Sequence, residues 1–375
     1  MNRPLLLCLL VALVLRLSFV LLVFPVLQNR WQLRDDGDGY RPIAQTIRDH
    51  QYNDVTRGPV YPSLVAACPG ITLKILQALL DTAVVALLFW LAGRQLSAAW
   101  LWALYPFAIW RVAFVNKETV LTFYLVIYLC LQLRAWRSGH WRDWMAAGLA
   151  CGLVNLCKPM FLLWPILLLA VVPRRAWILI VAMLVLIVPW TYRNWRVTGG
   201  EFLPVATERG GVTTFIGNFQ PTAGNWEGPG KPLWQAAVAE IIAKNAGASV
   251  VQLDRVFYRA AWQQFADHPI QALGLALRKC GRFWFFSAKH RELLLAGLIQ
   301  GGYLALLGIG LWRIRPWNRE IGLLLAMLGY VMVVHALSYA DLRFSLPVIP
   351  CVCVLASRTF APVAKTSLTG PCQQA

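Results

Sequence analysis

Charged residues are scarce in this chain. They make up 14% of its 375 residues, whereas about a quarter of the residues in a soluble domain are charged. Acidic residues are the scarcest, with 17 Asp and Glu against 35 Lys and Arg and a net charge of +18. Because 58% of the residues are hydrophobic and come in long blocks, the sequence excludes a soluble domain. It predicts an all-α, multi-pass membrane protein.

Several signatures of other protein classes are also missing. No Walker motif is present, which argues against direct ATP hydrolysis. The five His residues show no metal-ligand spacing. The basic residues form no long run and no nucleic-acid module, so we exclude nucleic acid as a partner and expect lipid headgroups or phosphorylated substrates instead. The nine cysteines form no disulfide framework, although Cys68 and Cys280 could pair in an oxidising compartment.

The apolar blocks predict about ten membrane spans, because a spanning helix needs about 20 apolar residues and fewer where it is short or buried. The first block resembles a signal peptide, but it is too long, contains Arg16 and lacks a cleavage site, so we expect it to be retained. Lys158-Pro159 separates the two shortest spans, since proline breaks a helix. The predicted spans are 4–27, 71–92, 97–115, 119–136, 143–157, 160–173, 176–192, 291–312, 320–338 and 344–361.

Short Arg-rich loops, such as residues 134–142, fall on one side of the predicted membrane. That side is therefore expected to be cytoplasmic, with both termini inside. The outer side holds a first outer loop at 28–70, which belongs to an N-terminal bundle of residues 1–192. It also holds an extracytoplasmic segment with interfacial helices at 193–290. Residues 291–375 complete the chain with further spans and a short cytoplasmic tail.

Three of the few acids stand close together just after the first span, at Asp35, Asp36 and Asp38. A calcium loop is excluded, because the twelfth position counted from Asp36 is Ile47 instead of Glu. An Asp-x-Asp pair is also found in soluble nucleotide-sugar transferases, but nucleotide sugars are not expected outside the membrane. A short amphipathic helix should begin near Tyr40. We expect Asp38 to cap it and Asp36 to take part in chemistry.

Further motifs follow the acids in a fixed order along the chain. They are "DGDGY" (36–40), "RGPVYPSLVA" (57–66), "LQALLDTAVVALLFWLAGRQLS" (76–97), "ALYPFAIW" (103–110), "NKETVLTF" (116–123), "GLACGLVNLCKPMFLLWP" (148–165), "VPWTYRNW" (188–195), "TERGG" (207–211) and "DLRFSLPVIP" (341–350). The ordered set resembles the GT-C glycosyltransferases, in particular the bacterial branch with the lipid A aminoarabinose transferases and the protein O-mannosyltransferases. One departure is Asp36-Gly37, where many relatives have Asp-Glu.

The resemblance implies a GT-C-like bundle with amphipathic surface helices in its first outer loop and a small outer-face segment. It also implies a bacterial inner-membrane protein with its active site on the periplasmic side. The implied reaction is an inverting transfer of a hexose or pentose from a polyprenyl-phosphate donor to a lipid, glycan or protein acceptor. Asp36 would be the base, Asp38 or Glu118 a second acid, and Tyr40 and Tyr61 substrate contacts. Asp36, Asp38 and Glu118 could also hold Mg or Mn.

The departing lipid phosphate needs basic partners. Such residues fall at the outer ends of the predicted spans, and each has a structural alternative as a loop cap, a snorkelling side chain or an interfacial anchor. The rival to an enzyme is a transporter, flippase or polymerase of lipid-linked saccharides, but such a protein should show repeats and polar groups at mid-membrane. The acids instead cluster at the outer surface, which favours the enzyme. The predicted phosphate ligands are Arg57, Lys117, Lys158, Arg193 and Arg343.

Overall fold

The structure is a computed structural model that describes residues 3–285 and 293–360. This part of the chain is helical and contains no strand. Seven of its helical segments are long and apolar enough to cross a membrane, which confirms an all-α, multi-pass membrane protein. These segments are α1 (Arg3–Ser18) with η1 (Phe19–Val23) and α2 (Phe24–Trp31), α5 (Ile71–Leu91), α8 (Glu118–Ser138), α11 (Pro173–Val197), α16 (Leu293–Arg313), α17 (Arg319–Leu337), and the last one of η5 (Leu342–Phe344), η6 (Leu346–Val348), α18 (Ile349–Ala356) and η7 (Ser357–Phe360).

Three of the ten predicted spans correspond to helices that are broken or have 17 residues or fewer. The predicted span 97–115 is divided into α6 (Leu96–Ala103) and α7 (Pro106–Arg111), because Pro106 has no N–H to continue the helical hydrogen bonding. The predicted span 143–157 is α9 (Trp141–Cys157), with 17 residues. The predicted span 160–173 contains only η2 (Pro159–Phe161) and α10 (Trp164–Val171). The described residues therefore contain seven helical segments that are long and apolar enough to cross a membrane, and the count of ten stays a prediction.

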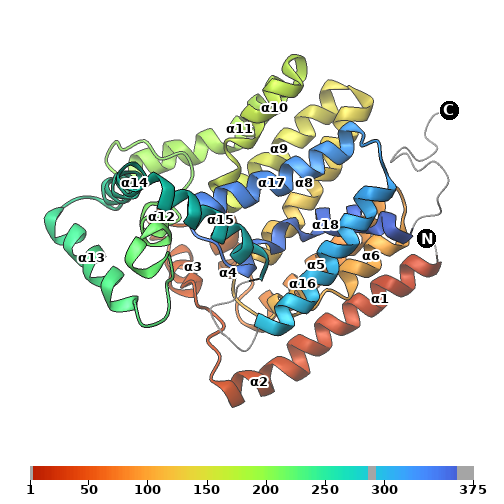
Figure 1. Ribbon diagram of the computed structural model, residues 1–375, viewed down its shortest axis with the longest axis horizontal. Helices are drawn as coiled ribbons and strands as arrows, with labels where there is room; N and C mark the ends of the chain where they lie inside the picture. Colours follow the sequence, from red (N-terminus) through yellow and green to blue (C-terminus); the bar gives the residue numbers. More distant parts are fainter. Residues whose placement is uncertain (1–2, 286–292, 361–375) are drawn as a thin grey trace.

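The long helices form a bundle with a smaller helical lobe at one end (Figure 1). This lobe consists of α12 (Gly210–Asn218), η3 (Gln220–Thr222), α13 (Lys231–Lys244), α14 (Val250–Asp267) and α15 (Pro269–Phe285). The short helices α3 (Tyr40–Arg48) and α4 (Val60–Ala67) lie at the same end, which we call the lobe end. The first helix begins at the opposite end of the bundle. The lobe and the first loop thus come together, although they are far apart in the sequence.

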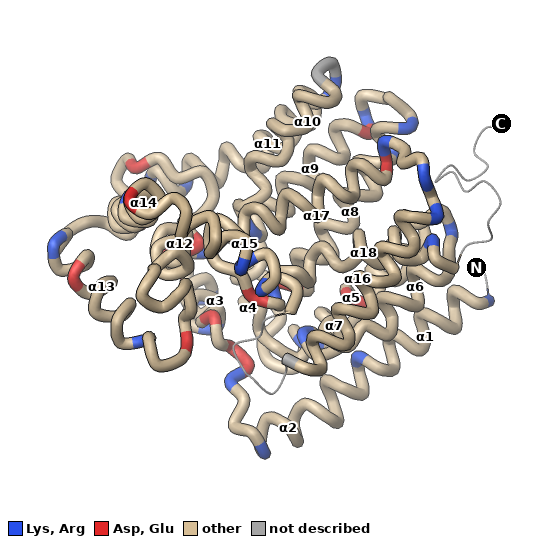
Figure 2. The backbone as a smooth tube through the Cα atoms, viewed as in Figure 1, with Lys and Arg blue, Asp and Glu red and all other residues tan. Residues whose placement is uncertain are grey.

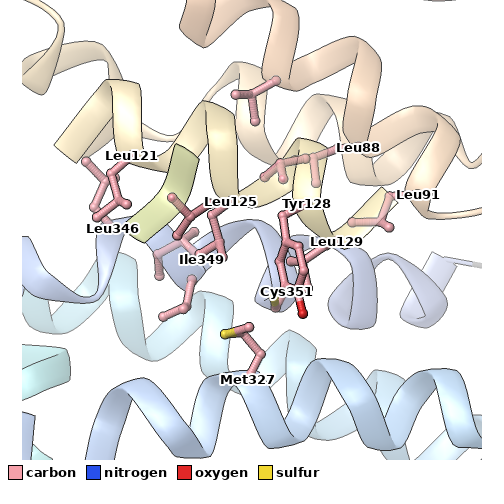
Figure 3. Packing of buried hydrophobic residues seen from close by; sticks show 14 of the residues in the cluster. Leu88, Leu91, Leu121, Leu125, Tyr128, Leu129, Met327, Leu346, Ile349 and Cys351 are labelled. Carbon is pink, nitrogen blue, oxygen red and sulfur yellow. The ribbon is translucent and has the colours of Figure 1, made fainter. Parts of the chain in front are cut away.

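Apolar side chains from four helical segments fill the centre of the bundle. Figure 3 shows Leu88 of α5, Leu125 of α8 and Met327 of α17 around Ile349 of α18. Every residue of α18 is buried, as expected for a helix that is apolar on all sides. The packed core gives the loops at the lobe end a rigid base.

A buried ion pair joins the first helix to the rest of the bundle. The guanidinium of Arg16 pairs with Asp81 of α5 and also donates to the main-chain oxygens of Ala103 (3.0 Å) and Trp102 (3.2 Å). Both charged side chains are buried, since an unpaired charge facing lipid is costly. This pair is a structural feature of the bundle interior.

Charge is unevenly distributed between the two ends of the bundle. Lys and Arg gather at the helix ends opposite the lobe (Figure 2). There Arg137 pairs with Glu320 (2.5 Å) and Arg358 donates to the main-chain oxygen of Ala92 (3.1 Å). Acidic and basic residues are mixed at the lobe end. The short Arg-rich loops predicted from the sequence therefore lie at the opposite end.

The possible Cys68–Cys280 disulfide does not form. Both thiols are free, Cys68 at the end of α4 and Cys280 within α15. The lobe and the first loop are therefore held together by non-covalent contacts alone at these positions.

Candidate functional site at the lobe end

The loop before α3 places its acids differently from the sequence prediction. Asp36, and not Asp38, caps the helix, since its two carboxylate oxygens accept the main-chain N–H groups of Tyr40 and Arg41, each at 2.8 Å. Gly39 has a left-handed backbone (φ 74°), which glycine adopts readily. The turn folds the chain back so that Asp36 lies over the first turn of the helix. The expected capping by Asp38 is wrong.

Asp35 attaches the same loop to the bundle. Its carboxylate receives two hydrogen bonds from Arg41 (2.8 and 2.7 Å) and an ion pair from Lys74 of α5 (2.9 Å). Burial alone would raise the pKa of Asp35, but the hydrogen bonds with Arg41 and Lys74 outweigh it and lower the pKa to about 2. Asp35 is thus ionised over the physiological range and has a structural role.

Asp38 faces three of the predicted phosphate ligands, Arg343, Arg57 and Lys117. Its Oδ1 lies 3.3 Å from Nη1 of Arg343, and its main-chain oxygen accepts Nη2 of Arg57 at 3.3 Å. The side chains of Asp38 and Arg343 are 25% and 32% exposed, so solvent reaches both. Burial raises the pKa of Asp38, but the charges of Arg343, Arg57 and Lys117 lower it below its ordinary value. Asp38 is therefore an accessible carboxylate among cations.

Glu208 belongs to the same group of side chains, although the sequence analysis did not single it out. It pairs with Lys117, lies 3.9 Å from Nη1 of Arg57, and accepts the main-chain N–H of Gly58 at 2.9 Å. Burial raises the pKa of Glu208, and the charges of Lys117 and Arg57 reverse that shift. Glu208 thus holds Arg57 and Lys117 in place.

One sequence signal could have found Glu208. It is one of only 17 acidic residues, and a Gly-Gly pair follows it after one residue. Glu208 and Arg209 both have left-handed backbones (φ 52° and 53°), which is uncommon for residues other than glycine and tends to occur at functional sites. The backbone conformation itself is visible only in the structure.

Lys158 and Arg343 meet at one aromatic ring. Lys158 directly follows α9, where Pro159 ends the helix. Its Nζ lies 4.6 Å from the ring centroid of Phe344, and the guanidinium carbon of Arg343 lies 4.8 Å from the same centroid. Two basic residues from distant parts of the sequence therefore share this ring.

Glu118 begins α8 and is 3% exposed. Its Oε2 has no hydrogen-bond partner among the described residues, which is costly for a buried carboxylate oxygen. The expected gathering of Asp36, Asp38 and Glu118 around a metal does not occur. In residues 3–285 and 293–360, no three His, Cys, Asp or Glu side chains lie close enough to hold a metal ion.

Arg193 lies outside this group. Its guanidinium donates to the main-chain oxygens of Asp54 (2.9 Å) and Tyr52 and packs over the rings of Tyr52 and Trp190 at 4.6 and 4.7 Å. These contacts attach the first loop to α11. Arg193 therefore has a structural role as an anchor, which was the alternative to phosphate binding.

The two tyrosines expected to contact substrate lie in the core instead. Tyr40 and Tyr61 are 1% and 0% exposed, and their rings meet edge to face with centroids 4.7 Å apart. The Tyr61 hydroxyl donates to Gln77 at 2.8 Å. Both rings lie on the buried side of α3 and α4 and support these helices. A substrate at the protein surface therefore does not reach the rings.

Four of the five predicted basic residues and two of the predicted acids thus come together at the lobe end, joined by Glu208. We call this group the basic cluster; it brings four basic side chains together with three acids. Comparison with family models, with curated proteins and with solved structures finds no match to this chain. The cluster consists of Arg57, Lys117, Lys158 and Arg343 with Asp38, Glu118 and Glu208.

Proposed function

We propose that this chain is an integral-membrane glycosyltransferase. It transfers a sugar, with inversion, from a polyprenyl-phosphate donor to a lipid, glycan or protein acceptor. The supporting observation is the basic cluster, in which four Lys and Arg side chains converge next to the accessible carboxylate of Asp38 at one end of a membrane bundle. The GT-C arrangement is part of the same proposal, and it rests on the ordered motifs in the sequence.

The basic cluster suits a lipid phosphate as the leaving group. When the sugar–phosphate bond breaks, negative charge grows on the phosphate oxygens, and cations placed in advance stabilise that charge. Arg343 and Arg57 can each offer two parallel N–H groups to a phosphate, and Lys158 adds a point charge.

Asp38 is the better candidate for the base. It already touches Arg343, so a donor phosphate bound by Arg343 would draw the guanidinium away and leave the carboxylate free to accept the acceptor's proton. Asp36 was the base expected from the sequence, but both of its oxygens accept main-chain N–H groups. We therefore assign helix capping to Asp36 and the role of the base to Asp38.

The lobe end is proposed to face the periplasm of a bacterial inner membrane. The Arg-rich helix ends lie opposite the lobe, which is the cytoplasmic pattern. A single cysteine placed at position 225, in the lobe, should react with a membrane-impermeant maleimide in intact cells, and one at position 138, the last residue of α8, should not. The reverse labelling pattern would refute this orientation.

Cleavage of the sugar–phosphate bond of the donor separates this proposal from a transporter or flippase. Purified protein in detergent, given membrane lipid extracts from cells that lack it, should release free polyprenyl phosphate and join the sugar to an acceptor. Mass spectrometry of the lipid fraction measures both products. A flippase would leave the sugar–phosphate bond intact, so an unchanged lipid pool in the presence of folded protein would refute the proposal. The Arg343→Ala variant is the matched control.

A further inference from the structure

Phe344 lies at the centre of the basic cluster without carrying a charge. It ends η5, next to Arg343 in the sequence. Its ring centroid is 4.8 Å from the guanidinium carbon of Arg343 and 4.6 Å from Nζ of Lys158. At such distances the negative face of an aromatic ring attracts a cation. One ring therefore positions two of the proposed phosphate ligands.

The ring of Phe344 is itself supported from one side. The imidazole of His335 is stacked on it, with centroids 4.4 Å apart and planes 7° from parallel. His335 is 5% exposed, its Nδ1 lies 2.9 Å from the main-chain oxygen of Tyr339, and it also stacks against Phe283. The imidazole covers one face of Phe344 and so limits the movement of the ring. The ring therefore has little freedom to tilt away from the two cations.

The two cations at Phe344 are only partly paired with acidic groups. Among the described residues, no carboxylate lies within ion-pair distance of the Lys158 ammonium group. Arg343 contacts Asp38 through Nη1 only, at 3.3 and 3.5 Å, although a guanidinium has five N–H donors. Two cations held at one ring repel each other, and an anion between them would remove that repulsion.

We propose that Phe344 is a positioning residue that holds Arg343 and Lys158 at the spacing at which both bind the donor phosphate. This inference rests on the proposed function and assigns the placement of the two cations to an aromatic ring. In this proposal the phosphate contacts the two cations and does not contact the ring.

Binding of a short polyprenyl monophosphate tests this role without any transfer reaction. Farnesyl phosphate is the probe, and farnesol is the matched control that lacks the phosphate. In calorimetric titrations of the purified protein, Phe344→Leu should weaken farnesyl phosphate binding about tenfold, because the ring contacts of both cations are lost. Farnesol binding should not change. Phe344→Tyr keeps the ring and should bind within about threefold of the unsubstituted protein.

A second pair of variants separates positioning from a general structural role. In a Lys158→Met background, Phe344→Leu should weaken farnesyl phosphate binding less than it does when Lys158 is present, since one of the two positioned cations is already gone. Equal losses in both backgrounds would overturn the inference, and so would an equal loss for farnesol. Phe344→Met provides the same comparison if the leucine variant does not fold.

The outcomes also distinguish this inference from the proposed function. If the unsubstituted protein binds farnesol as tightly as farnesyl phosphate, the donor-phosphate site itself is refuted. If it prefers the phosphate and folded Phe344→Leu keeps that preference in full, only the role of Phe344 is refuted.

Discussion

Replacing Arg343 with alanine should abolish sugar transfer without unfolding the protein. The contacts that would be lost are modest. The ion pair with Asp38 is long (3.3 Å) and partly exposed, so it is worth about 0–1 kcal/mol, and the contact with Phe344 adds about 0.5–1 kcal/mol. Stability should therefore fall by at most about 2 kcal/mol. Losing one donor that stabilises a developing oxyanion costs about a hundredfold or more in rate.

The assay compares transfer rate with the amount of folded protein in the membrane. Arg343→Ala should reach normal abundance and show almost no transfer. Arg343→Lys should also lower the rate strongly, because an ammonium group cannot give two parallel hydrogen bonds. Asp341→Asn is the control, since the Asp341 carboxylate accepts the main-chain N–H of Arg343 (3.0 Å) and an amide oxygen can do the same. A fully active Arg343→Ala variant at normal abundance would remove this residue from the site.

Three further predictions address the acids. Asp38→Asn should abolish transfer at normal abundance because an amide cannot accept the proton. Asp36→Asn should retain most activity because Asn also caps helices. The reverse result would assign the role of the base to Asp36. Burial raises the pKa of Asp254 from 3.8 to about 6, so the thermal midpoint of the lobe should rise as the pH falls from 6 towards 4. In scanning fluorimetry Asp254→Asn should flatten this slope, and an unchanged slope would exclude Asp254 as its source. Asp81→Ala leaves Arg16 buried and unpaired and should lower the free energy of unfolding by about 3–5 kcal/mol. The variant should be less abundant in the membrane, and the additional substitution Arg16→Met should restore its abundance.

The sequence predicted much of the bundle because long apolar runs have few alternatives to spanning helices. It also predicted the meeting of Arg57, Lys117, Lys158 and Arg343, since residues at the outer ends of spans share one end of the bundle. The break within the predicted span 97–115 was less apparent, because the run is apolar on both sides of Pro106. The bundle accommodates short helices in this region because α6 is packed inside it against α1, α5 and α18.

Side-chain roles that depend on main-chain partners could not be predicted from the sequence. The guanidinium of Arg193 donates hydrogen bonds to the main-chain oxygens of Tyr52 and Asp54. No sequence pattern shows which carbonyl groups point at a side chain. The exchange of roles between Asp36 and Asp38 has a similar cause. It depends on the left-handed turn at Gly39, which reverses the direction of the loop and decides which carboxylate lies over the helix.

The scarcity of acids gives their placement at the lobe end a physical meaning. Four cations gathered in a partly buried site repel one another strongly, so some must be neutralised before the fold can hold them. Asp38, Glu118 and Glu208 supply three negative charges there, out of 17 acidic residues in the chain. The acids therefore limit the affinity of the cluster for anions as well as stabilising it. Removing the charge of Glu208 should then strengthen non-productive anion binding while releasing Lys117 and Arg57 from their fixed positions.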